Sequence, residues 1–435
     1  MSERVAGFPI ASNVTQEMNA SLTAEVLPEE IRRTVFGMGS KQEPRSDGFT
    51  GKFFKAFWGI GGDSVIEAVR SFFATSRMLR SFNHTWLTLI PKVDQVESMR
   101  QLRPISLCQF VYKVITKIMV ERLAGVLPII VSEGQNAFIR DRQIVENTLL
   151  AHELMHYLKI KTRGKKGYMA LKVDMEKAYD RVEWSFLLAV LEKMSFNSVW
   201  RGWVQECLQS ASFSVLMNGA LSGFFSSSRG LQQGEPLSPL LFVLCTEGFA
   251  ALLRQAISEK RLEGVKVAPR APRISHLFFT DDSYLFFRGS LQECENLIEV
   301  LNEYEELGGQ KVNLSKSAVC FSKNISLPDQ EFLGTILGVG AVGVHDKYLG
   351  IPTLIARSKV ATFRYLEEKL LERLQGWKRR TLSWAAKETL IKPVALALPL
   401  HVMSCFRLPL SPCRLLDKHV ARFWWGVEDG QSRIR

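Results

Sequence analysis

One stretch of the chain, residues 274–289, constrains the fold more than any other, because it reads as a β-hairpin with two acidic residues at its tip. Its sequence is ISHLFFTDDSYLFFRG, in which two runs rich in aromatic residues flank Asp281 and Asp282. Aromatic residues favour strands, and a short polar interruption between two such runs predicts a tight turn. Two adjacent carboxylates repel each other unless a cation lies between them. An ordinary solvated Asp-Asp turn is the alternative, and a third carboxylate argues against it.

The third carboxylate follows another predicted strand. Apolar residues alternate with smaller or more polar ones along residues 167–173, and Asp174 comes next. A period of two predicts a strand with one buried face. Adjacent strands lie about 4.8 Å apart, so a strand-end Asp can face a hairpin-tip Asp across a metal ion. We therefore predict that Asp174, Asp281 and Asp282 hold Mg²⁺, which takes hard oxygen ligands.

The remaining patterns predict alternating helices and strands. Helices are expected from residue 28, over 50–80 and 109–124, from residue 184, and over 238–256 and 290–307, and residues 135–158 are expected to form a loop that enters another helix. Strands are expected over 85–92, 213–219 and 311–322. Ser238 suits an N-cap, and Ser290 with Glu293 resembles a capping box. Asn218-Gly219 marks a hairpin turn. This order predicts an α+β fold in which an antiparallel sheet is backed by helices on one side.

Length and charge bound the organisation of the chain. Its 435 residues exceed the roughly 250–300 that one hydrophobic core supports, so we expect two or three subdomains. Residues 1–27 are polar and irregular and are expected to form a disordered lead-in. The net charge is +12, and residues 347–435 carry 17 lysines and arginines against 7 acidic residues. A basic segment on a near-neutral body suggests a face that meets a phosphate backbone.

Two basic segments are candidates for such a face. Residues 363–377 place apolar side chains three or four positions apart, which predicts a helix. The cations beside this stripe are candidate nucleic-acid contacts: Arg373, Lys378, Arg379 and Arg380. A solvated helix end or a nuclear-localisation signal remains open for the last three. The loop KTRGKKG (161–167) is either a template contact or a solvated turn.

Cysteines and apolar stretches indicate the compartment. The seven cysteines are odd in number and never spaced as CxxC, so neither a disulfide framework nor a zinc knuckle is expected. The N-terminus lacks the apolar core of a signal peptide, and residues 393–408, interpreted as a buried core segment, are too short to span a bilayer. We expect a reducing intracellular location, nucleus or cytoplasm, with no membrane partner. His152 and His156, four apart on a predicted helix, lack a third metal ligand.

Three ordered motifs carry a family resemblance. The segments KVDMEKAYDRVEW (172–184), RGLQQGEPLSPLLF (229–242) and FTDD (279–282) resemble motifs A, B and C of reverse transcriptases. The flanking segments, RPISL (103–107), QNAF (135–138), NLSKS (313–317) and YLGIP (348–352), resemble the LINE-type non-LTR retrotransposon polymerases, most closely those of plants. The resemblance covers about residues 28–428.

This resemblance implies a fold and an activity. The fold is the right-hand polymerase fold, with an N-terminal extension and fingers over residues 28–166, a palm over 167–345 and a helical thumb over 346–435. The activity is RNA-directed DNA polymerisation, in which a DNA primer 3′-end is extended with dNTPs on an RNA template. Two Mg²⁺ ions, for which Mn²⁺ can substitute, would serve the transfer.

The resemblance also implies residue roles. Asp174 and Asp281 would be the main metal ligands, with Asp282 beside them. Tyr179 would exclude a 2′-hydroxyl, the alternative being a core aromatic at a strand end. The other implied contacts are Gln233 and Gly234 with the template base and incoming nucleotide, Lys92 and Arg103 with the triphosphate, and Lys316 as the acid for pyrophosphate.

Departures from the family pattern leave other functions open. Glu235 replaces Asp in QGDP, Thr280 replaces Ala in FADD, and residues 41–49 lack the glycine and second proline of KAPGPDGF. A catalytically inactive, degenerate nucleic-acid-binding protein is the main alternative, and a maturase-like RNA chaperone is a third. In every case the crowding of three carboxylates should raise the pKa of at least one.

Overall fold

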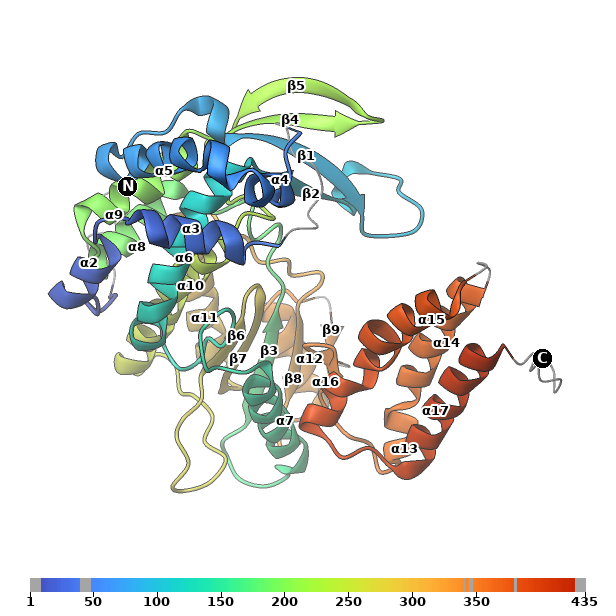
Figure 1. Cartoon of the computed structure of the whole chain (residues 1–435). Helices are drawn as coiled ribbons and strands as arrows, with labels where there is room; N and C mark the ends of the chain where they lie inside the picture. Colours follow the sequence, from blue (N-terminus) through green and yellow to red (C-terminus); the bar gives the residue numbers. More distant parts are fainter. Residues whose placement is uncertain (1–8, 40–47, 340, 344–346, 379–381, 427–435) are drawn as a thin grey trace.

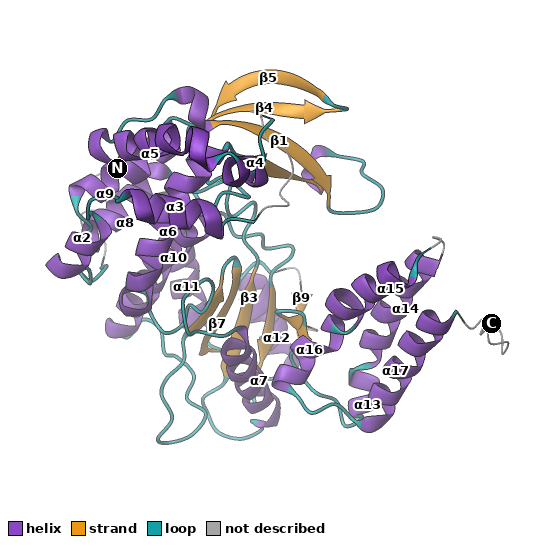
Figure 2. Ribbon diagram, viewed as in Figure 1, coloured by secondary structure: helices purple, strands orange, loops and turns teal. Residues whose placement is uncertain are grey.

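The chain forms a part built on two sheets, followed by a separate group of C-terminal helices (Figure 1). The structure is a computed structural model that describes residues 9–39, 48–339, 341–343, 347–378 and 382–426. Helices and strands are mixed along the sequence (Figure 2), which fits the expected α+β class. The segment that departs from KAPGPDGF lies largely outside the described residues.

The central sheet is five-stranded, in the order β6-β7-β3-β8-β9. Its strands are β3 (Tyr168–Val173), β6 (His276–Phe279), β7 (Asp282–Arg288), β8 (Ala318–Phe321) and β9 (Ala341–Val342). All pairs are antiparallel except β8 with the short β9, which are parallel. The predicted strands at 167–173 and on both arms of the acidic hairpin are therefore confirmed, whereas the strand expected over 311–322 is limited to β8.

Helices cover both faces of the central sheet, not one face as the alternation suggested. Met169 and Leu171 of β3 pack in the main core with α10 (Ser238–Ser258) and α11 (Leu291–Gly308). Tyr168 and Ala170, on the opposite face, pack with α7 (Ile144–Ile160). The prediction that helices cover only one face of the sheet was wrong. Tyr168 and Ala170 are less apolar than their neighbours, but the tyrosine is aromatic and the alanine is small, so both can be buried.

The second sheet has four strands in the order β2-β1-β4-β5. They are β1 (His84–Pro91), β2 (Leu102–Leu107), β4 (Ser212–Met217) and β5 (Ala220–Ser226), and β1 pairs with β4 in parallel. The expected hairpin turn is confirmed: Asn218 and Gly219 have φ values of 50° and 80° between β4 and β5.

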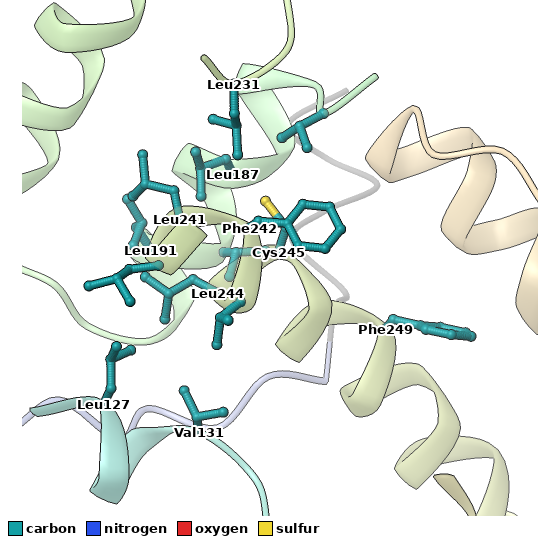
Figure 3. Packing of buried hydrophobic residues seen from close by; sticks show 14 of the residues in the cluster. Leu127, Val131, Leu187, Leu191, Leu231, Leu241, Phe242, Leu244, Cys245 and Phe249 are labelled. Carbon is teal, nitrogen blue, oxygen red and sulfur yellow. The ribbon is translucent and has the colours of Figure 1, made fainter. Parts of the chain in front are cut away.

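The main core surrounds α10. Figure 3 shows Leu241, Phe242 and Leu244 of this helix among leucines from α6 (Phe110–Ile130), α8 (Trp184–Lys193) and the loop before α10. Within the described residues α10 alone is long and apolar enough to cross a membrane, but 83% of its most apolar window is buried inside the protein. Its apolar character is therefore that of a core helix.

The N-terminal region is more ordered than expected. Residues 16–22 form α2 (Gln16–Leu22), whose Leu22 is fully buried and which packs against α6. The remaining helices of this part are α3 (Pro28–Gly37), α4 (Gly51–Ala56), α5 (Trp58–Thr75), α9 (Ser198–Gln209) and α12 (Leu327–Ile336), with short 3₁₀ turns at Arg80–Asn83 and Met99–Gln101. The disordered lead-in predicted over residues 1–27 was therefore wrong from residue 16 onward.

The C-terminal group starts with the two-residue strands β10 (Lys347–Tyr348) and β11 (Ile351–Pro352). Its helices are α13 (Lys359–Thr362), α14 (Arg364–Lys378), α15 (Trp384–Leu390), a π-helix (Ile391–Ala395), α16 (Ala397–Cys405) and α17 (Leu410–Trp425). The predicted apolar stripe is confirmed, since Phe363, just before α14, and Leu366, Leu370 and Leu374 within it are buried. Residues 393–408 are not a buried core segment: Leu396, Leu400 and Met403 are exposed.

Candidate active site

The acidic hairpin places its two carboxylates on different parts of the turn. Phe279 pairs with Asp282 as the last rung of the β6–β7 ladder, so Thr280 and Asp281 form the connection and Asp282 begins β7. Thr280 has a φ of 57°. This left-handed conformation is unusual for a β-branched residue, so the tip of the hairpin is a strained position.

The register of β3 brings the third carboxylate to the same place. Val173 pairs with Ser283, and the antiparallel ladder continued by one residue sets Asp174 opposite Asp282. Residues that lie directly opposite each other on two antiparallel strands are close enough for their side chains to interact. The structure thus joins Asp174, Asp281 and Asp282 at one end of the central sheet, as the sequence required.

The electrostatics of the three groups reflect this proximity. Burial raises the pKa of Asp174, and the Asp281 carboxylate raises it further, against the lowering effect of nearby Lys316 and Lys172. Burial also raises the pKa of Asp282, and Asp281 and Asp174 add to that rise. The expectation that crowding raises at least one pKa holds in direction, although loss of solvent contributes more than repulsion.

The protein side chains supply only part of the ligand set that Mg²⁺ needs. Within the described ranges of the chain, no three His, Cys, Asp or Glu side chains form a complete metal-binding group. Mg²⁺ is usually bound through one or two carboxylates together with substrate phosphates, so an incomplete protein ligand set is what a phosphate-assisted site requires. Asp174, Asp281 and Asp282 fit that type of site.

Two hydrogen bonds join the segment NLSKS (313–317) directly to Asp174. The Asn313 N–H donates to the Asp174 carbonyl oxygen at 2.7 Å, and the Asp174 N–H donates to Ser317 Oγ at 3.2 Å. The Lys316 N–H in turn donates to the Asn313 carbonyl oxygen at 3.1 Å. This turn holds the Lys316 ammonium group near enough to lower the pKa of Asp174.

A cavity of about 900 Å³ joins this acidic end to the second sheet. Eight of the residues predicted from the sequence line it: Lys92, Arg103, Asp174, Tyr179, Gln233, Gly234, Asp281 and Lys316. Cations therefore face carboxylates across one space, which is the arrangement that a nucleotide triphosphate with its metal needs. Asp282 borders the carboxylates but does not line the cavity.

The cationic wall comes from the β1–β2 hairpin. Ile90 pairs with Arg103 and Pro91 with Leu102, so Arg103 and the next residue after β1, Lys92, lie at the same end of the two strands. The Lys92 N–H donates to the Gln101 carbonyl oxygen at 2.8 Å, which closes the hairpin. Both cationic side chains are exposed to the cavity.

Tyr179 lies between the cavity and the core. Its ring stacks on Phe242 of α10, with ring centroids 4.8 Å apart and planes inclined by 10°. Burial raises the pKa of the Tyr179 phenol, and the Asp281 charge adds to the rise. These surroundings agree with both interpretations of Tyr179, the core aromatic and the residue that excludes a 2′-hydroxyl, because one side of the ring is packed and another borders the cavity.

The loop before α10 is bound to β2. The Ser106 N–H donates to the Gln233 carbonyl oxygen at 2.7 Å. Gly234 has a φ of 106°, and a Cβ there would lie 3.0 Å from the Ser106 carbonyl oxygen. Only glycine meets both conditions, so this residue allows the loop to approach the strand closely.

Glu235, which replaces the Asp of the family pattern QGDP, has a structural role that the sequence did not indicate. Its buried carboxylate accepts hydrogen bonds from the Leu237 N–H at 2.8 Å, the Ser238 N–H at 2.5 Å and the Ser238 hydroxyl at 2.7 Å. The N-cap position is occupied by Leu237, not by Ser238 as predicted. Glu235 therefore caps α10 from two residues before that position.

The predicted capping box of α11 is half formed. The Glu293 N–H donates to Ser290 Oγ at 3.4 Å, as expected for an N-cap. The Glu293 carboxylate instead accepts from the backbone N–H groups of Glu263 and Arg288.

Two further residues of the site were missed. Gln233 Nε2 donates to Asp180 Oδ1 at 3.4 Å, and Asp180, whose pKa is raised by burial, lines the cavity. Lys172 Nζ donates to the Lys347 carbonyl oxygen at 3.2 Å, while its charge lowers the pKa of Asp282. Asp180 could have been identified from the sequence, because it follows Tyr179 directly. Lys172 could not, because its position in the site depends on the tertiary structure.

The remaining predicted residues lie elsewhere. Arg373 is exposed on α14 and does not line the cavity, Lys378 ends that helix, and Arg379 and Arg380 lie outside the described residues. His152 packs edge-on against Phe406 and joins no metal-binding group among the described residues.

Comparison with known proteins agrees with this geometry. Residues 90–366 match the family described as reverse transcriptase (RNA-dependent DNA polymerase). The chain is 26% identical over 424 residues, 96% of its length, to the transposon TX1 uncharacterized 149 kDa protein of Xenopus laevis, of which it covers 31%. It is 25% identical over 245 residues, 55% of its length, to a retrovirus-related Pol polyprotein from the type-1 retrotransposable element R2 of Popillia japonica, of which it covers 33%.

A shorter match connects the chain with a plant protein. Over 68 residues, 16% of the chain, it is 52% identical to the uncharacterized mitochondrial protein AtMg01250 of Arabidopsis thaliana, of which it covers 56%. The chain thus spans about a third of the first relative and about half of this one. Because the family match extends over more than half of its residues and includes the carboxylates and the cavity, the chain belongs to the reverse transcriptase family.

Proposed function

We propose that this chain is the RNA-directed DNA polymerase domain of a non-LTR retrotransposon, which extends a DNA primer on an RNA template with dNTPs. The observation that carries the proposal is the meeting of Asp174 with Asp281 and Asp282 beside a cavity lined by Lys92 and Arg103. The match to the R2 polyprotein supports the type of element. The 52% identity with the Arabidopsis protein supports a plant element.

In this proposal each residue has a task in nucleotidyl transfer. Asp174, Asp281 and Asp282 would hold the two Mg²⁺ ions, which when bound would supply activation of the attacking 3′-oxygen and stabilisation of the leaving pyrophosphate. Lys92 and Arg103 neutralise the triphosphate, the lysine as a point charge and the arginine as a fork of donors.

The other cavity residues orient the nucleotide and move a proton. Gln233 and Gly234 lie along the base pair, and Asp180 orients Gln233 through its hydrogen bond. Tyr179 limits the space at the sugar 2′ position. Lys316, held beside Asp174 by its turn, donates a proton to the leaving pyrophosphate.

The domain assignment follows the same proposal. The second sheet with α3–α6 corresponds to the N-terminal extension and fingers, the central sheet with α8, α10 and α11 to the palm, and the C-terminal group to the thumb. Arg373 and the following cations then contact the product duplex through its phosphates. The inactive alternative is not favoured, because the reverse transcriptase family match and the similarity to the R2 polyprotein both support a polymerase.

Primer extension on an RNA template with dNTPs and Mg²⁺ tests the proposal. Asp281→Ala should lower the extension rate by about a thousandfold or more, since it removes a ligand on which the transfer depends. Asp63→Ala is the matched control, because Asp63 is an exposed aspartate on α5, away from the cavity. Extension by the Asp281 variant at the rate of the control would refute the mechanism.

A further inference from the structure

A second basic surface lies at the end of the central sheet opposite the carboxylates. The loops 161–167 and 260–273 together carry nine lysines and arginines and one glutamate. The first loop leads into Tyr168 at the start of β3, whereas Asp174 follows the last residue of that strand. At about 3.3 Å per residue, roughly 20 Å separates the loop from the carboxylates. Figure 1 shows both loops projecting beyond the lower end of the sheet.

The one glutamate joins the two loops into a single surface. Glu263 accepts from Lys166 Nζ at 3.0 Å and from Arg273 Nη1 at 2.7 Å. Hydrogen bonds from Arg273 and Lys166 lower the pKa of Glu263, so it remains ionised at neutral pH. We call the exposed cations of these loops the basal patch; they are Arg163, Lys165, Lys166, Lys260, Arg270 and Arg273.

Further hydrogen bonds fix the backbone of both loops. The Asn324 side-chain amide donates to the carbonyl oxygens of Gly164 at 2.8 Å and Lys166 at 2.9 Å. In the second loop, Val265 and Ile274 exchange two backbone hydrogen bonds of 2.8 and 2.9 Å. The basal patch is therefore held in place before any partner binds, which lowers the entropic cost of binding.

The patch has more positive charge than the protein itself neutralises. Glu263 is shared by Lys166 and Arg273, and within the ranges that the structure describes Arg163, Lys165 and Arg270 form no ion pair. Such an excess is a binding surface for a polyanion. Neither loop contains an aromatic residue, so stacking on bases is not available and contact with phosphates is the remaining mode.

We propose that the basal patch binds the phosphate backbone of RNA at a place separate from the cavity. The patch lies roughly 20 Å from the carboxylates, so residues 161–167 would contact an RNA template away from the place of synthesis. An RNA long enough to reach both places is then held at two points, which strengthens its binding beyond that of a short template.

The test compares long and short nucleic acids. The triple variant Arg163→Glu, Lys165→Glu and Arg270→Glu changes cations that have no carboxylate partner among the described residues. Its affinity for an RNA of about 100 nucleotides, measured by fluorescence anisotropy, should fall about tenfold or more. The slope of log affinity against log salt should fall by about 2 to 3, because about one phosphate contact is lost per residue. Extension of a short template–primer should keep its wild-type rate.

A control variant separates the patch from net charge. Arg33→Glu, Arg77→Glu and Arg80→Glu make the same charge change at exposed residues of the N-terminal part. An equal loss in both triples, or no loss of RNA affinity in the patch triple, overturns the proposal. So does a patch triple that loses binding to phosphatidylserine vesicles while RNA binding is unchanged, which would indicate a membrane partner instead.

Separate control measurements address the folding of the variants and the catalytic activity of the protein. Thermal unfolding checks that the patch triple remains folded, and an Arg163→Ala, Lys165→Ala and Arg270→Ala variant replaces it if charge reversal prevents folding. RNA affinity is measured without nucleotides, so a wild-type protein that fails to extend primers would refute the proposed function while leaving this test interpretable.

Discussion

At the scale of single residues, Tyr179 shows how one side chain can have two roles. Its stacking on Phe242 links it to the core helix α10, and its position on the cavity wall sets it near Asp281. The sequence alone could not decide between core packing and a sugar gate, because both require an aromatic residue at this position. Substitutions that keep or remove the ring separate the two roles.

We predict that Tyr179→Val raises incorporation of rNTPs relative to dNTPs by about tenfold or more, because the smaller side chain leaves room for a 2′-hydroxyl. One such contact is worth about 1–3 kcal/mol of discrimination. The ratio of kcat/KM for the two nucleotide classes is the measurement. Tyr179→Phe, which retains the ring, should keep the wild-type ratio. If Tyr179→Val lowers stability but leaves the ratio unchanged, the residue is only a core aromatic.

At the scale of elements, α10 depends on a cap that its own first residues do not provide. Glu235 satisfies the backbone donors at the start of the helix while it is buried. Burial raises the pKa of Glu235 above its usual 4.5, against the lowering effect of its hydrogen bonds. The raised pKa means that the folded state binds this proton more tightly than the unfolded state.

Glu235→Ala should lower the free energy of unfolding by about 1–3 kcal/mol, because it leaves buried N–H groups without acceptors. The loss should be largest below pH 4.5 and should decrease as pH rises through the raised folded-state pKa, since a raised carboxyl pKa stabilises the fold only while the group stays protonated. Urea unfolding of both proteins at several pH values is the measurement. A loss that increases with pH would show that the pKa is lowered instead.

Elements with strong local patterns were predicted, and those set by distant partners were not. The arms of the acidic hairpin are rich in aromatic residues, the sequence of β3 alternates with a period of two, and α14 carries apolar residues three or four positions apart. The helix α2 has a single fully buried residue, Leu22, and its order depends on α6. Residues 393–408 are apolar, yet the large side chains of Leu396, Leu400 and Met403 are exposed, which composition cannot reveal.

The candidate site was predictable to a similar extent. The resemblance identified eight of the residues that line the cavity, and the strand pattern placed Asp174 at a strand end. The hydrogen bonds of Asp180 and Lys172 could not be predicted, since each joins segments that are distant in the sequence. The same holds for the Glu263 ion pairs that unite the basal patch.

At the scale of the whole molecule, the C-terminal helices have cores of their own. Leu370 and Leu374 pack with Leu416 and Phe423 in one cluster, and Phe363 packs with Val402 in another; neither merges with the main core. Separate clusters make separate cooperative units, so we expect two unfolding transitions.

Leu370→Ala should lower the Tm of one transition and leave the other unchanged. Leu370 is 1% exposed, and removing a buried leucine costs about 2–5 kcal/mol. Differential scanning calorimetry is the measurement. Leu400→Ala is the matched control: Leu400 is 59% exposed in the same group of helices, and its loss should cost less than about 0.5 kcal/mol. A single transition that shifts as a whole would contradict the division.

The hydrogen bond from Lys172 to the Lys347 carbonyl oxygen has a consequence for movement. Lys172 belongs to the central strand and lies in the field of Asp174 and Asp282, whereas Lys347 opens the C-terminal group. A swing of the C-terminal helices that breaks this bond releases a positive charge next to the acidic end of the sheet. Any movement of the C-terminal group relative to β3 would thereby alter the charge balance at the acidic end of the sheet through the Lys172 side chain.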